Sequence, residues 1–238
     1  DIGLEESADS LLHGINGKIL KQKIAGGEWV PFKSAGQIEP KDGYDIVTTI
    51  DINLQDITES TLLQAVTQYQ AAFGCAILME VKTGAIKAIA NIGRNKNGIY
   101  SENYNYAIGM SNEPGSVFKM AGYLALFDDG FITLNDSINT NHASAVFGGK
   151  VLTDDGHNTQ YTFLTPGKAF AISSNVAIAS WLSKYYSGKK EKFYQKLQQF
   201  GLTHPTYIDL KGEQNPYINK PDKWSGMSLA WIGHGYEV

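Results

Sequence analysis

Between residues 44 and 91 the hydrophobic pattern changes its period twice, and this constrains the fold more than any other feature of the chain. Residues 45–50 are β-branched and predict a strand. Residues 54–69 then place apolar side chains on one face at a spacing near 3.6, which predicts a helix. Two apolar runs, 75–81 and 85–91, follow and predict a β-hairpin. The segment therefore indicates a mixed helix and strand fold.

Capping and stop residues predict further helices on both sides of this segment. Asp51 or Asn53 is expected to cap the helix at 54–69. Thr165 and Pro166 are the expected cap and first residue of another helix, and glycines are expected to stop three more. The remaining predicted helices cover residues 116–129, 165–172, 176–186 and 190–200.

Residues 1–43 have a different character from the rest of the chain. They are rich in glycine and predict one helical turn near residues 5–12, followed by hairpins. Such a stretch is too thin to form its own core, so it is interpreted as a linker or the end of a preceding domain. The chain opens at Asp1 in mid-pattern, and we expect it to be an internal piece of a longer protein.

Composition excludes several classes of function. The 238 residues are 42% hydrophobic, which is enough to bury a core, and the net charge of -4 argues against a nucleic-acid-coating protein. Cys75 is the single cysteine, so neither an internal disulfide nor a multi-cysteine metal site can form. No apolar run reaches the roughly 18 residues that a transmembrane helix requires.

The first candidate for chemistry is Ser116-Val117-Phe118-Lys119. Residues i and i+3 share one face of a helix, so the Ser116 hydroxyl and the Lys119 amine can meet. A serine nucleophile needs a neighbouring base, and a lysine can serve when burial lowers its pKa. Pro114-Gly115 places Ser116 at a helix start, where free N–H groups stabilise developing negative charge. By itself the pattern also arises by chance in many helices.

The second candidate is Ser173-Ser174-Asn175, 57 residues downstream of Ser116. A serine and an asparagine two positions apart in a loop can face the same substrate, the hydroxyl relaying a proton and the amide binding a peptide group. The alternative is that Ser174 or Asn175 only caps the next helix.

The remaining polar clusters favour structural roles. Asp154, Asp155 and His157 resemble a metal or acid–base cluster, but a loop of this kind more often uses such residues for turns and caps. The other histidines have no ligand spacing, so no metal is expected. These are His13, His142, His204 and His234.

Taken together, Ser-x-x-Lys and Ser-x-Asn are two of the three motifs of penicillin-binding proteins and serine β-lactamases. The chain resembles the transpeptidase domain of class B penicillin-binding proteins of the division type from about Tyr44 to Val238. Residues 1–43 resemble the end of the family's pedestal domain. The segments that carry the resemblance, besides the two motifs, are Thr48–Gln55, Glu80–Ala90, Asn103–Ala107, Glu113–Ser116, Phe200–Leu202, Lys211–Glu213 and Ile232–Tyr236.

The family's third motif, Lys-Thr/Ser-Gly, lies after the Ser-x-Asn loop. Lys82-Thr83-Gly84 precedes Ser116 and is predicted to form a hairpin tip, so we interpret it as structural. The resemblance therefore implies an α+β fold of the penicillin-binding-protein and serine β-lactamase type. This fold is expected to be incomplete, because the chain stops before the third motif and the C-terminal strands. The expected domains are 1–43, the pedestal end, and 44–238, an incomplete transpeptidase domain.

The resemblance implies a peptidoglycan D,D-transpeptidase that works through a serine acyl-enzyme and is acylated by β-lactams. Ser116 is then the nucleophile, Lys119 the general base, Ser173 the proton relay and Asn175 the substrate-binding amide, with no cofactor or metal. The expected partners are stem peptides and, for the parent protein, a membrane glycosyltransferase and division or elongation proteins. The parent is expected on the outer face of the inner membrane, anchored by an N-terminal helix.

Two alternatives stay open. One is a β-lactamase or β-lactam sensor of the same fold, although the chain lacks the Glu-x-x-Leu-Asn element that supplies a deacylating base in class A enzymes. The other is a non-catalytic scaffold within a division complex.

Overall fold

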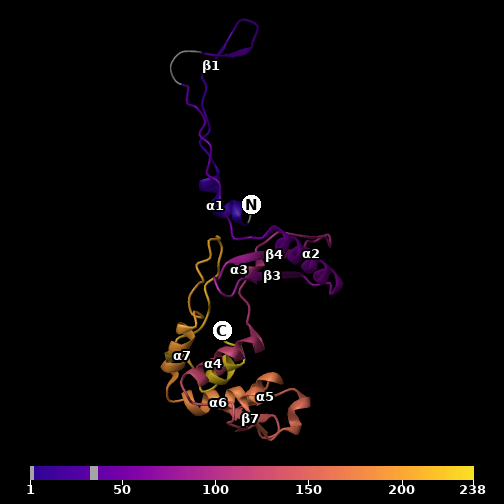
Figure 1. The fold of residues 1–238 in the computed structure, drawn as a ribbon, viewed down its shortest axis with the longest axis vertical. Helices are drawn as coiled ribbons and strands as arrows, with labels where there is room; N and C mark the ends of the chain where they lie inside the picture. Colours follow the sequence, from indigo (N-terminus) through magenta and orange to yellow (C-terminus); the bar gives the residue numbers. More distant parts are fainter. Residues whose placement is uncertain (1–2, 33–36) are drawn as a thin grey trace. The chain divides into compact units, whose positions relative to one another are not determined.

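The computed structural model describes residues 3–32 and 37–238, and its contacts divide the chain into two compact units (Figure 1). Unit 1 comprises residues 1–110 with 207–213, and unit 2 comprises residues 111–206 with 214–238. Both units contain helices and strands, as the sequence predicts. The predicted domain division after residue 43 stays a prediction. Within the described residues, no helix is both long and apolar enough to cross a lipid bilayer.

Unit 1 contains three helices and five strands among its described residues. These are α1 (Leu4–Leu12), β1 (Lys21–Lys23), β2 (Trp29–Pro31), α2 (Ile52–Gln68), β3 (Phe73–Met79), β4 (Ile86–Arg94), β5 (Tyr100–Ser101) and α3 (Tyr106–Gly109). Strands β1 and β2 form one antiparallel pair, and β3, β4 and β5 form a three-stranded sheet in that order. The helical turn and a hairpin expected near the start of the chain are therefore present.

The predicted central hairpin is confirmed. Phe73 pairs with Gly93 at one end of β3 and β4, and Met79 pairs with Ile86 at the other. Lys82-Thr83-Gly84 lies at the connecting turn, where Gly84 has a φ of 76° that favours glycine. Helix α2 packs on β4 and β3.

The strand predicted at residues 45–50 is wrong, because the structure has no regular element there. The β-branched side chains have a strand propensity, but that propensity stabilises a strand only where a neighbouring strand offers a hydrogen-bond ladder. The segment instead leads directly into α2. The predicted cap is confirmed at Asp51, whose carboxylate accepts hydrogen bonds from the N–H groups of Asn53 and Leu54 at 3.0 and 3.2 Å.

Unit 2 is richer in helix. Its α-helices are α4 (Lys119–Asp128), α5 (Pro166–Ala171), α6 (Asn175–Tyr186), α7 (Lys190–Gln199) and α8 (Ser228–Gly233). Short 3-10 turns are η1 (Gly115–Phe118), η2 (Gly156–Gln160) and η3 (Pro221–Lys223). The strands are β6 (Ile138–Asn139), β7 (Ser144–Phe147), β8 (Lys150–Thr153) and β9 (Phe163–Leu164), which pair as β6–β9 and β7–β8. The four predicted helices are present, whereas α8 and the short strands were not predicted.

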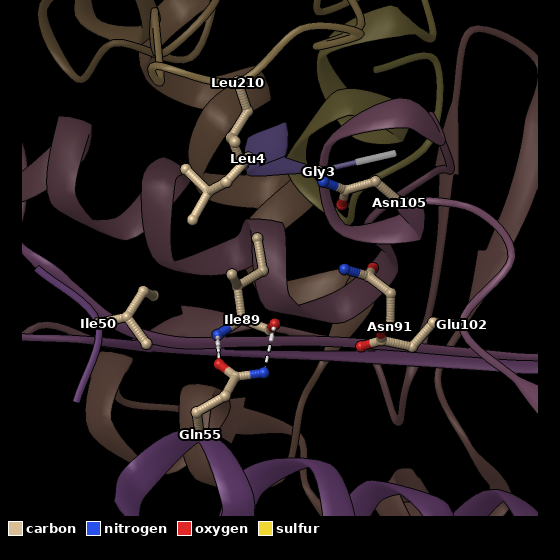
Figure 2. Close-up of a pocket in the computed structure, with 9 residues that line it drawn as sticks. All are labelled: Gly3, Leu4, Ile50, Gln55, Ile89, Asn91, Glu102, Asn105 and Leu210. Atoms are coloured by element: carbon tan, nitrogen blue, oxygen red, sulfur yellow. Dashed lines mark hydrogen bonds between the residues drawn. The ribbon is translucent and has the colours of Figure 1, made fainter. Parts of the chain in front are cut away.

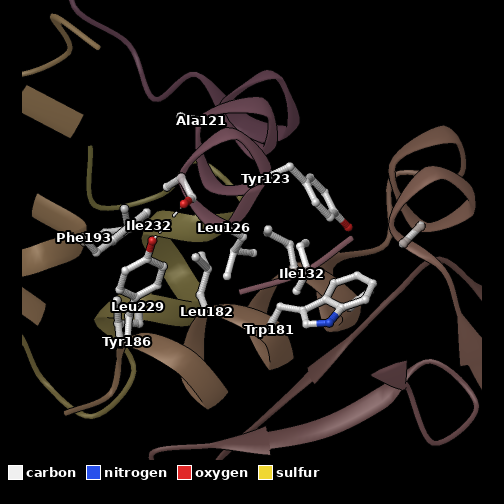
Figure 3. Close-up of a cluster of buried hydrophobic side chains, with 14 of the residues drawn as sticks. Ala121, Tyr123, Leu126, Ile132, Trp181, Leu182, Tyr186, Phe193, Leu229 and Ile232 are labelled. Carbon is white, nitrogen blue, oxygen red and sulfur yellow. Dashed lines mark hydrogen bonds between the residues drawn. The ribbon is translucent and has the colours of Figure 1, made fainter. Parts of the chain in front are cut away.

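Helix α6 lies at the centre of the unit 2 core (Figure 3). Trp181, Leu182 and Tyr186 on this helix are at most 1% exposed, and apolar side chains of α4, α7 and α8 pack around them. A helix that is apolar on most of its surface is stable only when it is covered on several sides. The core therefore fixes the N-terminal end of α6, where the Ser-x-Asn motif lies.

Helix α8 approaches α6 closely at Gly233. A Cβ atom on that residue would lie 2.5 Å from Leu182 Cδ1, and Leu182 is fully buried. Gly233→Ala should therefore lower the free energy of unfolding by about 1–3 kcal/mol through overpacking. The measurement is urea unfolding followed by circular dichroism. Gly167→Ala in α5 is the control, because its new methyl group would meet no atom within 4 Å. Equal stabilities of the two variants would contradict the close approach.

Candidate active site

The turn that precedes α4 places Ser116 at the start of a helix. Pro114 and Gly115 lead into η1, Gly115 has a φ of 60°, and Ser116 is exposed. The Gly115 N–H donates to the Gly235 carbonyl oxygen at 3.1 Å, and a Cβ on Gly235 would lie only 1.9 Å from the Gly115 oxygen. A glycine is therefore required at 235 for the C-terminal segment to lie against the turn that carries Ser116.

Lys119 is the first residue of α4 and is 1% exposed. Its Nζ donates hydrogen bonds to the Ser173 Oγ at 2.8 Å and to the Ser173 carbonyl oxygen at 2.5 Å. Burial lowers the pKa of Lys119 to about 8, although the negative charge of Asp154 acts in the opposite direction. Roughly a tenth of such a lysine is neutral at pH 7, so it can accept a proton.

The Ser-x-Asn motif forms the turn between α5 and α6. Ser173 is exposed and has a φ of 56°, which is a strained value for a residue other than glycine. Ser174 is fully buried and caps α6, because its Oγ accepts a hydrogen bond from the Ala177 N–H at 3.0 Å. The capping alternative thus applies to Ser174, whereas Ser173 contacts Lys119.

Asn175 begins α6 and is half-buried. Its Nδ2 donates to the Thr153 carbonyl oxygen at 3.4 Å, which connects it to the end of β8. The structure therefore brings Lys119 next to the turn between α5 and α6, which contains Ser173 and leads into Asn175. These are three of the four predicted site residues.

The prediction that the Ser116 hydroxyl and the Lys119 amine can meet stays a prediction. Among the residues that the structure describes, none makes a hydrogen bond to the Ser116 hydroxyl, and the Lys119 amine is bonded to Ser173. Both residues nevertheless belong to one continuous helical segment, at positions i and i+3. Catalytic hydrogen bonds are often long without substrate and tighten when it binds.

Asp154 caps the start of α6, whereas the sequence analysis assigned it only in general terms to the turns and caps of its loop. Its Oδ2 accepts from the Ser174 hydroxyl at 2.5 Å, and its Oδ1 accepts from the Val176 N–H at 2.8 Å. The sequence signal for a cap is local, and Asp154 caps α6 from about twenty positions upstream, so no local pattern identifies it. Asp155 and His157 are exposed, and the Asp155 side chain makes no capping hydrogen bond.

The structure gives Asp154, Asp155 and His157 separate positions. No group of three histidine, cysteine or acidic side chains suited to hold a metal ion occurs among residues 3–32 and 37–238. The three residues are therefore assigned individually: Asp154 binds the start of α6, and the other two lie at η2.

Two more buried side chains, His234 and Tyr123, lie near Lys119 and Asp154. His234 is 7% exposed, and its Nδ1 lies 2.6 Å from the Ala230 carbonyl oxygen. Burial lowers the pKa of His234, and the positive charge of Lys119 lowers it further. Tyr123 lies one turn after Lys119 on α4, and its buried hydroxyl has no hydrogen-bond partner among the described residues.

Unit 1 contains a separate pocket of about 300 Å³ (Figure 2). Within it the Gln55 side-chain amide pairs with the backbone of Ile89 in β4, at 2.8 and 3.0 Å. Asn91 and Asn105 also line it, but none of the predicted catalytic residues does. The candidate chemistry therefore lies in unit 2.

Sequence comparisons agree with this assignment. The family described as "Penicillin binding protein transpeptidase domain" matches residues 74–238. The peptidoglycan D,D-transpeptidase FtsI of Buchnera aphidicola is 31% identical over 98% of this chain. The chain spans 40% of the length of that relative.

Solved structures agree as well. A protein of Atopobium parvulum has a TM-score of 0.82 at 27% identity, with 99% of this chain and 52% of that chain covered. Penicillin binding protein 3 of Mycobacterium tuberculosis, in complex with ampicillin, has a TM-score of 0.77 at 25% identity, with 99% and 48% covered. The fold is thus the penicillin-binding-protein transpeptidase fold, and the chain belongs to the penicillin-binding protein transpeptidase family, among relatives of the class B, division type.

Proposed function

We propose that the protein containing this chain is a peptidoglycan D,D-transpeptidase that uses Ser116 as its nucleophile. The observation that carries the proposal is the contact between the buried Lys119 amine and the Ser173 hydroxyl, 54 residues apart in sequence. A lysine with a lowered pKa can accept the proton of the nucleophilic serine. When its amine is also bonded to another hydroxyl, here that of Ser173, the proton can pass on through that hydroxyl to a leaving amine. Family membership supports the same chemistry.

In the proposed reaction the Ser116 Oγ attacks the carbonyl carbon of a D-alanyl-D-alanine peptide bond while neutral Lys119 takes its proton. The Ser116 N–H, at the start of η1, contributes one donor to the oxyanion. The C–N bond then breaks, Ser173 delivers the proton to the leaving amine, and D-alanine departs. The resulting ester on Ser116 is attacked by the amine of a neighbouring stem peptide, which forms the cross-link and restores the serine. Asn175 binds the peptide backbone of the donor.

β-Lactams are proposed to acylate the same serine, because their strained amide presents a similar carbonyl. A relative in this fold has been solved in complex with ampicillin. The proposed partners of the parent protein are stem peptides, a membrane glycosyltransferase and division or elongation proteins. Its proposed location is the outer face of the inner membrane, with an N-terminal membrane anchor.

The test is covalent labelling by a fluorescent penicillin, followed by mass spectrometry of the labelled peptide. We expect a mass increase equal to that of the intact β-lactam on the peptide that contains Ser116. Labelling of a peptide without Ser116, or no covalent adduct in the parent protein, would overturn the proposal. Rapid loss of the adduct with release of hydrolysed β-lactam would instead favour the β-lactamase alternative.

The length of the chain should affect the rate of acylation. After Asn175 the 238 residues contain no further Lys-Thr-Gly or Lys-Ser-Gly triplet, and such a strand is proposed to supply a carboxylate-binding cation and a second oxyanion donor. Loss of one oxyanion donor costs about 10²–10³ in rate, so we expect this chain to be acylated roughly a hundredfold more slowly than a parent protein that includes the strand. Stopped-flow labelling of the two proteins measures the ratio. Rates within threefold of each other would contradict the prediction.

A further inference from the structure

A carboxylate from the β7–β8 hairpin holds the start of α6. Asp154 follows β8 directly, and both of its carboxylate oxygens accept hydrogen bonds from the turn that begins α6. One partner is the hydroxyl of Ser174, which is fully buried, and the other is the backbone N–H of Val176. A carboxylate that accepts two hydrogen bonds at a helix start is stabilised there by the helix dipole as well.

The residue next to this contact is Ser173, which the proposed function uses as the proton relay. Its φ of 56° costs free energy in a non-glycine residue, and such a conformation persists only when the surrounding structure holds it. The Lys119 amine bonds both the hydroxyl and the carbonyl oxygen of Ser173, so both acceptors depend on this conformation. Because Asp154 bonds the adjacent residue, it is well placed to hold the turn.

Asp154 also acts on Lys119 through its charge. The negative carboxylate favours the protonated amine and so opposes the effect of burial on the Lys119 pKa. The other ionisable groups that face this pair are His234, which feels both charges, and Tyr123, which feels Asp154. Burial lowers the pKa of His234 and raises that of Tyr123, so both are neutral between pH 7 and 9.

We propose that Asp154 is a positioning residue for acylation, which holds the Ser173 turn against Lys119 and stabilises the positive charge of that lysine. The inference rests on the proposed acyl transfer at Ser116. Asp154 itself touches no reacting atom in this scheme, and it acts through Ser174, Val176 and the charge on Lys119.

Three variants separate the two effects. Asp154→Asn removes the charge and weakens the hydrogen bonds. Ser174→Ala keeps the charge but removes the hydrogen bond to Asp154 together with the cap on the Ala177 N–H. Asp155→Asn is the control at the neighbouring exposed carboxylate. The acylation rate constant is measured by stopped flow from pH 6.5 to 9.5 in the parent protein. Circular dichroism establishes that each variant is folded.

Asp154→Asn should lower the plateau rate about tenfold and move the rising limb of the pH profile to lower pH, because Lys119 loses its proton more easily without the carboxylate. Ser174→Ala should lower the plateau without moving the limb. Asp155→Asn should match the wild type in both respects. If Asp154→Asn does not fold, Ser174→Ala still tests the positioning effect, and an unchanged plateau in that variant overturns it.

A second measurement does not depend on activity. NMR titration of ¹³C-labelled lysines, with Lys119→Arg to assign the resonance, should give a midpoint near 8 for Lys119 in the 238-residue chain and a lower midpoint in Asp154→Asn. Identical midpoints together with identical pH profiles would overturn the inference. If the parent protein forms no adduct with penicillin while the midpoint still shifts, the proposed function fails and the coupling of Asp154 to Lys119 stands.

Discussion

Replacement of Ser116 by alanine is expected to abolish covalent labelling by penicillin. The substitution removes the oxygen to which the acyl group is transferred in the proposed reaction. Removing the nucleophile of a serine hydrolase lowers turnover by about 10⁶, so the residual rate should lie below detection. The measurement is intact-mass analysis of the parent protein after incubation with benzylpenicillin.

The control for this variant is Ser111→Ala, a nearby exposed serine in the same unit. It should be labelled at the wild-type rate. The Ser116 variant should also keep the wild-type melting temperature, because its side chain is exposed and makes no hydrogen bond among the described residues. Labelling of Ser116→Ala at a comparable rate would show that another residue is the nucleophile.

Lys119→Met should lose 10²–10⁴-fold in acylation rate, the usual contribution of a positioned acid–base group. Methionine has a similar length and no base, so it occupies the buried space that alanine would leave empty. The lysine acts on proton transfer in the transition state, so the noncovalent affinity for penicillin should change much less. Stopped-flow measurements over a range of penicillin concentrations separate the acylation constant from the affinity.

The pH dependence gives a second readout for the same residue. A general base must be neutral, so the wild-type acylation rate should rise with pH through about 8, the lowered pKa of Lys119. Lys119→Met should lose this rising limb. Lys168→Met on α5 is the control and should keep the limb, because Lys168 is exposed and its amine lies over the Tyr161 ring. Equal and modest losses in rate and affinity, with the limb retained, would count against the general-base role.

Local sequence signals predicted most of the helices and the central hairpin correctly. Thr165 and Pro166 begin α5, Asp51 caps α2, and Gly84 occupies the turn between β3 and β4, because each of these choices depends on backbone geometry within a few residues. The strand expected at residues 45–50 failed for the opposite reason. A strand requires a pairing partner, and no local pattern specifies one.

The sequence by itself determined the spacing of Ser116 and Lys119 on one helical segment, since three positions along a helix bring two side chains to one face. It also marked Ser173 and Asn175 as candidates. Only the tertiary structure decided that the Lys119 amine meets Ser173 across 54 residues and that the Asp154 carboxylate accepts hydrogen bonds from Ser174 and Val176. These contacts exist because α6 packs against both α4 and β8, and the packing buries the lysine and lowers its pKa. Burial and long-range hydrogen bonds depend on how distant segments pack, so they were not available from any local pattern.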